Sequence, residues 1–165
     1  MRVMGIDPGS VITGWGIVEE TNRGLKAIQW GSIHNHSKTP FPERLKKIYD
    51  GLTDVMREYS PSAVAVEDMF FAVNVKSALK LGQTRGVILL SAVNENIPLG
   101  EYSPLEVKQS VSGYGRADKN QVKSMVKTLL NLKEDPEPLD ASDALAIAIC
   151  HIHTAGSNNR LAKAR

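Results

Sequence analysis

The first third of the chain alternates short apolar runs with turn signals. An apolar run over residues 3–6 ends at Asp7-Pro8-Gly9, because proline lacks an amide donor and glycine favours turns. Two longer runs, 11–19 and 25–33, are joined by Thr21-Asn22-Arg23-Gly24, a cluster of the kind that closes antiparallel hairpins. We therefore expect three opening strands that form an antiparallel meander.

Helical spacing begins after Pro40. Apolar residues recur every three or four positions up to Tyr59, which predicts an amphipathic helix over 43–59. The continuous apolar run 63–66 has the length of a strand buried on both faces. Further signals predict a helix capped by Asn74 and running to about Asn94, a short strand over 98–102, helices over 104–110 and 119–132, and a last helix from near Asp140.

A meander followed by alternating strands and helices predicts an α/β fold with a mixed sheet covered by helices. We expect one domain over residues 1–153 and a polar, disordered tail over 154–165. The single cysteine, Cys150, cannot form an internal disulfide, which fits a reducing cytoplasm. The N-terminus lacks the apolar core of a signal peptide, and no uncharged stretch is long enough for a membrane span, so we expect no membrane association.

Four acids stand where strands end or where the last helix begins: Asp7, Glu67, Asp140 and Asp143. Each also has a structural explanation, since Asp7 suits an Asx turn and the other aspartates suit a helix cap. Asp140 and Asp143 lie one helical turn apart, so they share a face that can point back at the two strand ends. By strand alternation, Asp68 points to the opposite face of the sheet from Glu67.

Four converging carboxylates repel one another unless cations lie among them. Two divalent ions balance the formal charge, and oxygen ligands favour Mg²⁺ or Mn²⁺ over zinc. Two such ions about 3.5–4 Å apart can clamp a phosphodiester, with one activating water and the other stabilising the leaving oxygen. The four acids therefore suggest a metal-dependent nuclease.

Basic residues concentrate in one part of the chain. The formal net charge is +2, but residues 106–133 hold six basic and two acidic side chains. Lys119, Lys123 and Lys127 recur every four residues on one face of a predicted helix, with no acid between them. Such a stripe suits DNA phosphates, although a solvated helix face has the same pattern. The glycine-rich segment before it, which contains Arg116, suits close approach to a phosphate.

Five groups of motifs follow one another through the chain. They are Gly5-Ile6-Asp7-Pro8-Gly9 with Thr13-Gly14-Trp15-Gly16, then Val66-Glu67-Asp68-Met69-Phe70, then Ser77-Ala78-Leu79-Lys80-Leu81-Gly82-Gln83, then Val107-Lys108-Gln109, then Asp140-Ala141-Ser142-Asp143-Ala144-Leu145-Ala146. From Gly5 to about His153 the chain resembles the RuvC family of crossover (Holliday) junction endonucleases, in the ribonuclease H-like superfamily.

The resemblance implies a ribonuclease H-like fold, with a mixed five-stranded sheet flanked by helices. It implies that Asp7, Glu67, Asp140 and Asp143 are catalytic and hold two Mg²⁺ ions, for which Mn²⁺ can substitute. The implied activity is resolution of four-way DNA junctions in recombination and repair by paired symmetric nicks that leave 5′-phosphate and 3′-hydroxyl ends. Some members of the superfamily carry histidine where this chain has Asp140, so the ligation there stays open.

The resemblance also implies DNA contacts and partners. Lys108 and Lys119 match basic positions near the scissile phosphate, and the position that matches Phe70 stacks on an unpaired base near the junction centre. A core position is the alternative for Phe70. Arg116 and Lys123 complete the predicted DNA-binding set. The implied partners are a second copy of the chain, joined through the helix that contains Gly82 and Gly86, and a branch-migration motor.

Three alternatives stay open on the sequence. Another ribonuclease H-like nuclease would act on a different substrate, such as an RNA–DNA hybrid. An ATP-binding phosphotransfer domain of the actin and sugar-kinase type shares the meander and the first Asp-x-Gly, but this chain has no second Asp-x-Gly for the other phosphate loop. A non-catalytic DNA-binding module would leave four acids repelling the phosphates that they approach.

Overall fold

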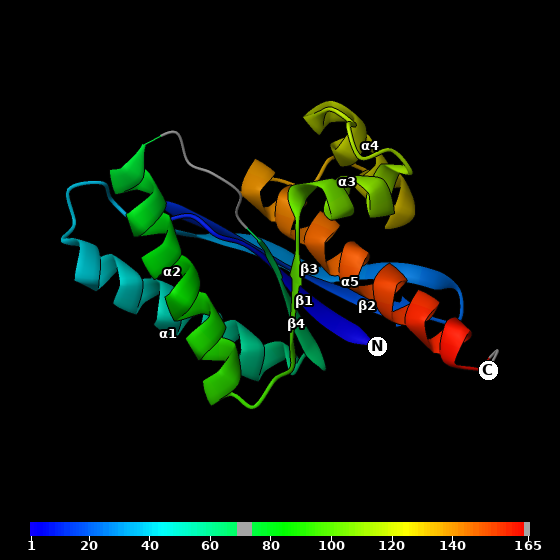
Figure 1. Cartoon of the computed structure of the whole chain (residues 1–165), viewed down its shortest axis with the longest axis horizontal. Helices are drawn as coiled ribbons and strands as arrows, with labels where there is room; N and C mark the ends of the chain where they lie inside the picture. The colour runs from blue at the N-terminus through cyan, green and yellow to red at the C-terminus, as the bar shows by residue number, and fades with distance from the viewer. Residues whose placement is uncertain (69–73, 164–165) are drawn as a thin grey trace.

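The computed structural model describes residues 1–68 and 74–163, and side chains of the last helix only up to residue 157. Its sheet has five strands in the order β3-β2-β1-β4-β5. Antiparallel pairing joins the first three, whereas β4 and β5 run parallel to β1, as Figure 1 shows. This confirms the predicted mixed sheet. The strands are β1 (Arg2–Asp7), β2 (Ile12–Thr21), β3 (Gly24–His34), β4 (Ala63–Glu67) and β5 (Leu99–Tyr102).

Helices cover both faces of the sheet (Figure 1). One face carries α1 (Phe41–Tyr59) and α2 (Val75–Asn94), and the other carries α3 (Pro104–Ser112), α4 (Lys119–Leu129) and α5 (Leu139–Lys163). Successive strand residues point to opposite faces. Met4, Ile6, Val64 and Val66 pack in the core beneath α1 and α2, while Val3, Ala63 and Ala65 pack beneath α5.

The last helix lies directly on the central strands because glycine removes the side chain between them. Gly5 of β1 faces α5, and a Cβ atom added there would overlap the carbonyl oxygen of Ala144. The small residues Ala144 and Ala148 line the opposite side of this contact and are fully buried. The close approach fixes where α5 crosses the sheet.

We expect Gly5→Ala to lower the free energy of unfolding by about 1–3 kcal/mol, the usual cost of overpacking a core. Urea unfolding followed by circular dichroism measures the change. Gly156→Ala is the matched control on α5, because a Cβ atom there meets open space. The control should be neutral or stabilising by up to about 1 kcal/mol, since alanine is the better helix former. Equal stability of the two variants would contradict the close approach.

The C-terminal segment differs from the prediction of a disordered tail after residue 153. Helix α5 continues to Lys163. The polar residues extend the helix because their hydroxyls bond to it: Thr154 Oγ1 donates to the carbonyl of Cys150, and Ser157 Oγ donates to that of His153. No helix in the described part of the chain is both long and apolar enough to cross a membrane.

Candidate active site

Two of the four predicted acids end neighbouring parallel strands. Asp7 closes β1 and Glu67 closes β4, and the residues just before them, Ile6 and Val66, are paired in the sheet. Both acids continue the strand positions that face α5. Asp68 turns to the opposite face, where its carboxylate lies 3.3 Å from Arg85 of α2, as the alternation predicts. The acids on the α5 side therefore meet at one edge of the sheet.

The other two acids lie in the first two turns of α5. Gly14 of β2 pairs with Asp7 across the sheet, and a Cβ atom added at Gly14 would overlap the carbonyl of Asp140. The glycine thus lets the start of α5 lie against β2, beside the end of β1. Asp140 and Asp143 are thereby brought to the edge that holds Asp7 and Glu67, and the structure groups all four predicted acids.

A cavity of about 300 Å³ opens at this edge. Its charged lining consists of Asp7, Glu67 and Asp143, together with Lys108 of α3 and Lys119 at the start of α4. Two helices thus bring cations to three carboxylates. Its apolar lining was not predicted from the sequence, because it depends on how α3, α4 and α5 pack: Pro104, Val107, Val122, Ala146 and Ile147.

Capping fixes the two helices that supply the lysines. Ser103 and Glu106 form a reciprocal capping box at the start of α3, and Asp118 and Gln121 form another at the start of α4. Each box satisfies amide donors that the first turn of a helix leaves unpaired. Lys119 follows the Asp118 cap directly, so the cap sets where its side chain begins.

The pKa values of the acids show how strongly their charges interact. Burial raises the pKa of Asp7 to about 8, with further increases from the charges of Asp143, Glu67 and Asp140. Burial also raises the pKa values of Glu67 and Asp143. Lys119 acts in the opposite direction on all three, because its positive charge favours the ionised carboxylates. The site is therefore short of positive charge at neutral pH.

The donors at this edge fit hard divalent cations. Every candidate ligand is a carboxylate oxygen, the type that Mg²⁺, Mn²⁺ and Ca²⁺ prefer. Within residues 1–68 and 74–163, no three acidic, histidine or cysteine side chains are close enough to surround one ion. The same mutual repulsion that raises the pKa values of these acids keeps carboxylates apart, and bound divalent cations would relieve it.

The predicted DNA-binding residues divide into three groups. Lys108 and Lys119 line the acidic cavity. Arg116 is exposed on the turn before α4. Phe70 lies outside the described residues. Lys123 differs from the prediction of an unopposed lysine stripe, because its Nζ lies 3.2 Å from Asp135, which also lies 3.4 Å from Lys127. The segment after α4 folds back to supply this acid, so helix spacing alone does not reveal it.

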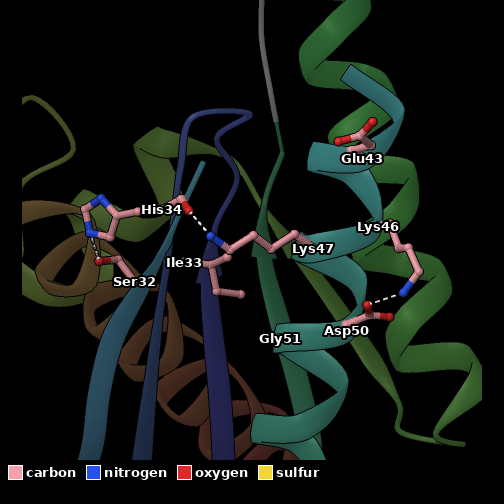
Figure 2. A pocket seen from close by; sticks show the side chains of 8 residues that line it. All are labelled: Ser32, Ile33, His34, Glu43, Lys46, Lys47, Asp50 and Gly51. Atoms are coloured by element: carbon pink, nitrogen blue, oxygen red, sulfur yellow. Dashed lines mark hydrogen bonds and ion pairs between the residues drawn. The ribbon is translucent and has the colours of Figure 1, made fainter. Parts of the chain in front are cut away.

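A larger cavity, about 550 Å³, lies between the end of β3 and α1 (Figure 2). Its charged groups are engaged with one another: Lys46 Nζ lies 2.5 Å from Asp50, and Lys47 Nζ donates to the carbonyl of His34 at 2.6 Å. The His34 ring is bonded to Ser32 at 2.7 Å. This cavity lacks the group of raised carboxyl pKa values found at the other edge, so we place the active site with Asp7 and Glu67.

Comparison with known proteins gives one family throughout. The family model described as crossover junction endodeoxyribonuclease RuvC matches residues 3–151. A protein of that name from Geobacter metallireducens is 51% identical over 165 residues, which covers 100% of each chain. One from Alkaliphilus oremlandii is 53% identical over 154 residues, covering 93% of this chain and 94% of the relative.

Solved structures agree with the sequence relatives. The structure described as T. thermophilus RuvC in complex with Holliday junction substrate has a TM-score of 0.88 and 33% identity, covering 95% of this chain and 96% of the other. The yeast mitochondrial Holliday junction resolvase has a TM-score of 0.64 at 13% identity over 92% of this chain and 78% of the other, and shares the fold. The ribonuclease H-like architecture, the grouped acids and these matches together show that the chain belongs to the RuvC family of crossover junction endodeoxyribonucleases.

Proposed function

We propose that this protein is a structure-selective endonuclease that resolves four-way DNA junctions by paired symmetric nicks. The observation that carries the proposal is the cavity in which Lys108 and Lys119 face Asp7, Glu67 and Asp143 at the carboxyl edge of the sheet. A non-catalytic DNA-binding module would have no use for three carboxylates beside its phosphate-binding lysines. The 33% identity to a RuvC solved with a Holliday junction substrate supports a branched DNA substrate.

Asp7, Glu67, Asp140 and Asp143 are the residues that would hold two Mg²⁺ ions, with Mn²⁺ as a substitute. Bound there, such ions supply an activated water and stabilise the leaving oxygen of the phosphodiester. Lys108 and Lys119 bind the phosphate and orient it over the carboxylates. The apolar side chains Val107, Val122 and Ile147 line the cavity and limit the water that reaches it. The products are 5′-phosphate and 3′-hydroxyl ends.

Equilibrium binding and end analysis test this proposal. In a buffer without divalent ions, a labelled four-way junction should bind the protein and resist competition by a linear duplex with the sequence of two arms. After Mg²⁺ is added, DNA ligase should reseal the nicked products without kinase treatment, because ligase requires a 5′-phosphate and a 3′-hydroxyl. Equal competition by duplex would remove junction selectivity, and unsealable ends would remove the hydrolytic route.

We infer a homodimer from the outer face of α2. Val75, Leu79, Leu90 and Val93 are exposed on this helix, with Leu79 at 63% and Leu90 at 52%. Their spacing places them in one stripe with Gly82 and Gly86, at which an added Cβ atom meets open space within this chain. An apolar stripe with two glycines suits the close approach of a second helix. A two-fold dimer also matches the near two-fold symmetry of a four-way junction.

Leu79→Glu should convert the dimer into a monomer, because two copies of the new carboxylate would be buried near each other at the two-fold axis. Sedimentation equilibrium at micromolar concentration measures the mass. Leu105→Glu is the matched control, since Leu105 is similarly exposed but lies on α3. A Leu79→Glu protein that stays dimeric, or a wild-type chain that is monomeric, would contradict an interface on α2.

The branch-migration motor remains a predicted partner, and the cytoplasm remains the predicted location. Stacking of Phe70 on a junction base and phosphate contacts from Arg116 are also predictions. Arg116 is supported by its exposure on the turn that leads to Lys119. A ribonuclease H-like nuclease for RNA–DNA hybrids is the competing function, and a hybrid duplex in the same competition experiment distinguishes it.

A further inference from the structure

Two cations flank one aromatic ring where α1 and α2 begin. The guanidinium carbon of Arg44 lies 5.1 Å from the ring centroid of Phe41, and Lys80 Nζ lies 6.0 Å from the same centroid. The negative face of an aromatic ring attracts each cation but does not neutralise it. Phe41 and Arg44 belong to α1 and Lys80 belongs to α2, so the cluster joins two helices through groups of like charge.

No acid balances this charge in the described part of the chain. The ion pairs found there include neither Arg44 nor Lys80, and residues 69–73 contain no acid. Arg44 is only 7% exposed, and its Nε atom has no hydrogen-bond partner. A buried guanidinium without an anion is costly, and its donors match the oxygens of a carboxylate or phosphate. The cluster therefore lacks an anion that the described residues do not supply.

The strand directions place this cluster beside the active site. Because β3 and β4 both run parallel to β1, all three strands end at the same edge of the sheet. Helix α1 begins soon after β3 ends, and α2 begins soon after β4 ends, on the face opposite α5 (Figure 1). Lys108 and Lys119 approach the same edge from the α5 face. Basic groups thus stand on both sides of the grouped carboxylates.

We propose that Arg44, Phe41 and Lys80 form a second phosphate-binding site, which takes a DNA backbone phosphate other than the one that is cut. The inference rests on the proposed function, because it assigns the anion to the DNA substrate. Arg44 supplies donors from a fixed, buried position, and Phe41 holds the guanidinium and the exposed Lys80 ammonium on either side of a shared ring. Inorganic phosphate has the same anionic oxygens and is the alternative occupant.

The salt dependence of junction binding tests this site. Lys80→Met removes one cation from an exposed position, so the fold should be retained. Lys46→Met is the matched control, because Lys46 is an exposed lysine of α1 whose ammonium pairs with Asp50 (Figure 2). Binding is measured without divalent ions across a range of salt. Loss of one phosphate contact should lower the slope of log K against log salt by about 0.9 and weaken binding about three- to tenfold at low salt.

Ethylation interference then locates the contact. Lys80→Met should lose sensitivity at one phosphate away from the cleavage point, whereas Lys46→Met should keep the wild-type pattern. Arg44→Lys should weaken binding similarly, with circular dichroism confirming that it folds. Sedimentation confirms that Lys80→Met keeps the wild-type mass, since Lys80 adjoins the apolar stripe of α2.

A wild-type slope and interference pattern in Lys80→Met would overturn the proposal. Binding of inorganic phosphate, followed by ³¹P line broadening that Lys80→Met abolishes, together with unchanged DNA binding, would overturn it in favour of a free-anion site. Failure of the proposed function has a separate readout, because it is the wild-type protein that would then fail to prefer or cut the junction. A lower slope on both junction and duplex supports the second site whether or not the wild type prefers the junction.

Discussion

Replacing Asp7 with asparagine should abolish junction cleavage and at the same time stabilise the metal-free protein. Asp7 ends β1 at the centre of the acidic group, and its pKa is raised to about 8 by burial and by the three neighbouring acids. Asparagine keeps the shape but removes the charge that would hold a divalent cation. Loss of one group that stabilises the transition state typically costs about 10²- to 10³-fold in rate, and we expect at least that here.

The stability change has a defined pH dependence. The folded state holds a proton on Asp7 more tightly than the unfolded chain, whose carboxyl has a pKa near 3.8. Wild-type stability therefore falls, relative to Asp7→Asn, as the pH rises from about 4 through about 8. One pKa unit corresponds to about 1.4 kcal/mol, and we expect the variant to be more stable by about 2–4 kcal/mol above pH 8.

Urea unfolding of both proteins at pH 4.5, 7 and 9, in EDTA, measures this difference. Mg²⁺ or Mn²⁺ at pH 8 should then stabilise the wild type and not Asp7→Asn, since a ligand that binds the folded state raises its stability. Asp68→Asn is the matched control, because Asp68 lies one residue from Glu67 but faces α2 and pairs with Arg85. An Asp7→Asn protein that cuts the junction at the wild-type rate would remove Asp7 from the active site.

Lys119→Met should reduce cleavage about 10²-fold, because Lys119 is both a phosphate-binding candidate and a cation that favours ionised carboxylates in the cavity. Its charge lowers the pKa values of Asp7, Glu67 and Asp143. Without it these carboxylates hold their protons to higher pH. The rise of the single-turnover cleavage rate with pH should therefore move to higher pH as well as lower rate.

Lys123→Met is the matched control for this change. Both lysines belong to the same face of α4, but Lys123 Nζ lies 3.2 Å from Asp135 and does not line the cavity. We expect its cleavage rate to stay within about threefold of the wild type, as for an exposed ion pair of small net contribution. If both variants lose activity equally, the lysines act as a uniform basic surface and Lys119 has no special position.

Most of the fold follows from local signals in the sequence. The turn residues after Ile6 and between β2 and β3 fix the meander, because proline and glycine end strands wherever they stand. The alternation of apolar residues in β1 and β4 places Asp7 and Glu67 on the same face, since both follow odd-numbered positions that face α5. One helical turn separates Asp140 from Asp143. The convergence of the four acids could therefore be predicted before any contact was known.

Features that depend on chain segments meeting in space could not be predicted in this way. Asp135 reaches Lys123 because the segment after α4 folds back, which no periodicity in α4 reveals. The contact of Gly14 with Asp140 joins residues far apart in the chain. The polar residues after His153 look like a tail, but their hydroxyls bond to carbonyls one turn back and continue α5. The Arg44 and Lys80 pair is also invisible until α1 and α2 are packed together.

Cleavage of a synthetic four-way junction, compared on a denaturing gel with a linear duplex made from the same arms, tests the central claim most directly. The wild-type protein with Mg²⁺ should nick two opposite strands of the junction at symmetric positions and leave the duplex intact. EDTA or the Asp7→Asn substitution should abolish both nicks. Equal cutting of the duplex would contradict junction selectivity. Cleavage that persists in EDTA or in Asp7→Asn would contradict a carboxylate site that works with divalent cations.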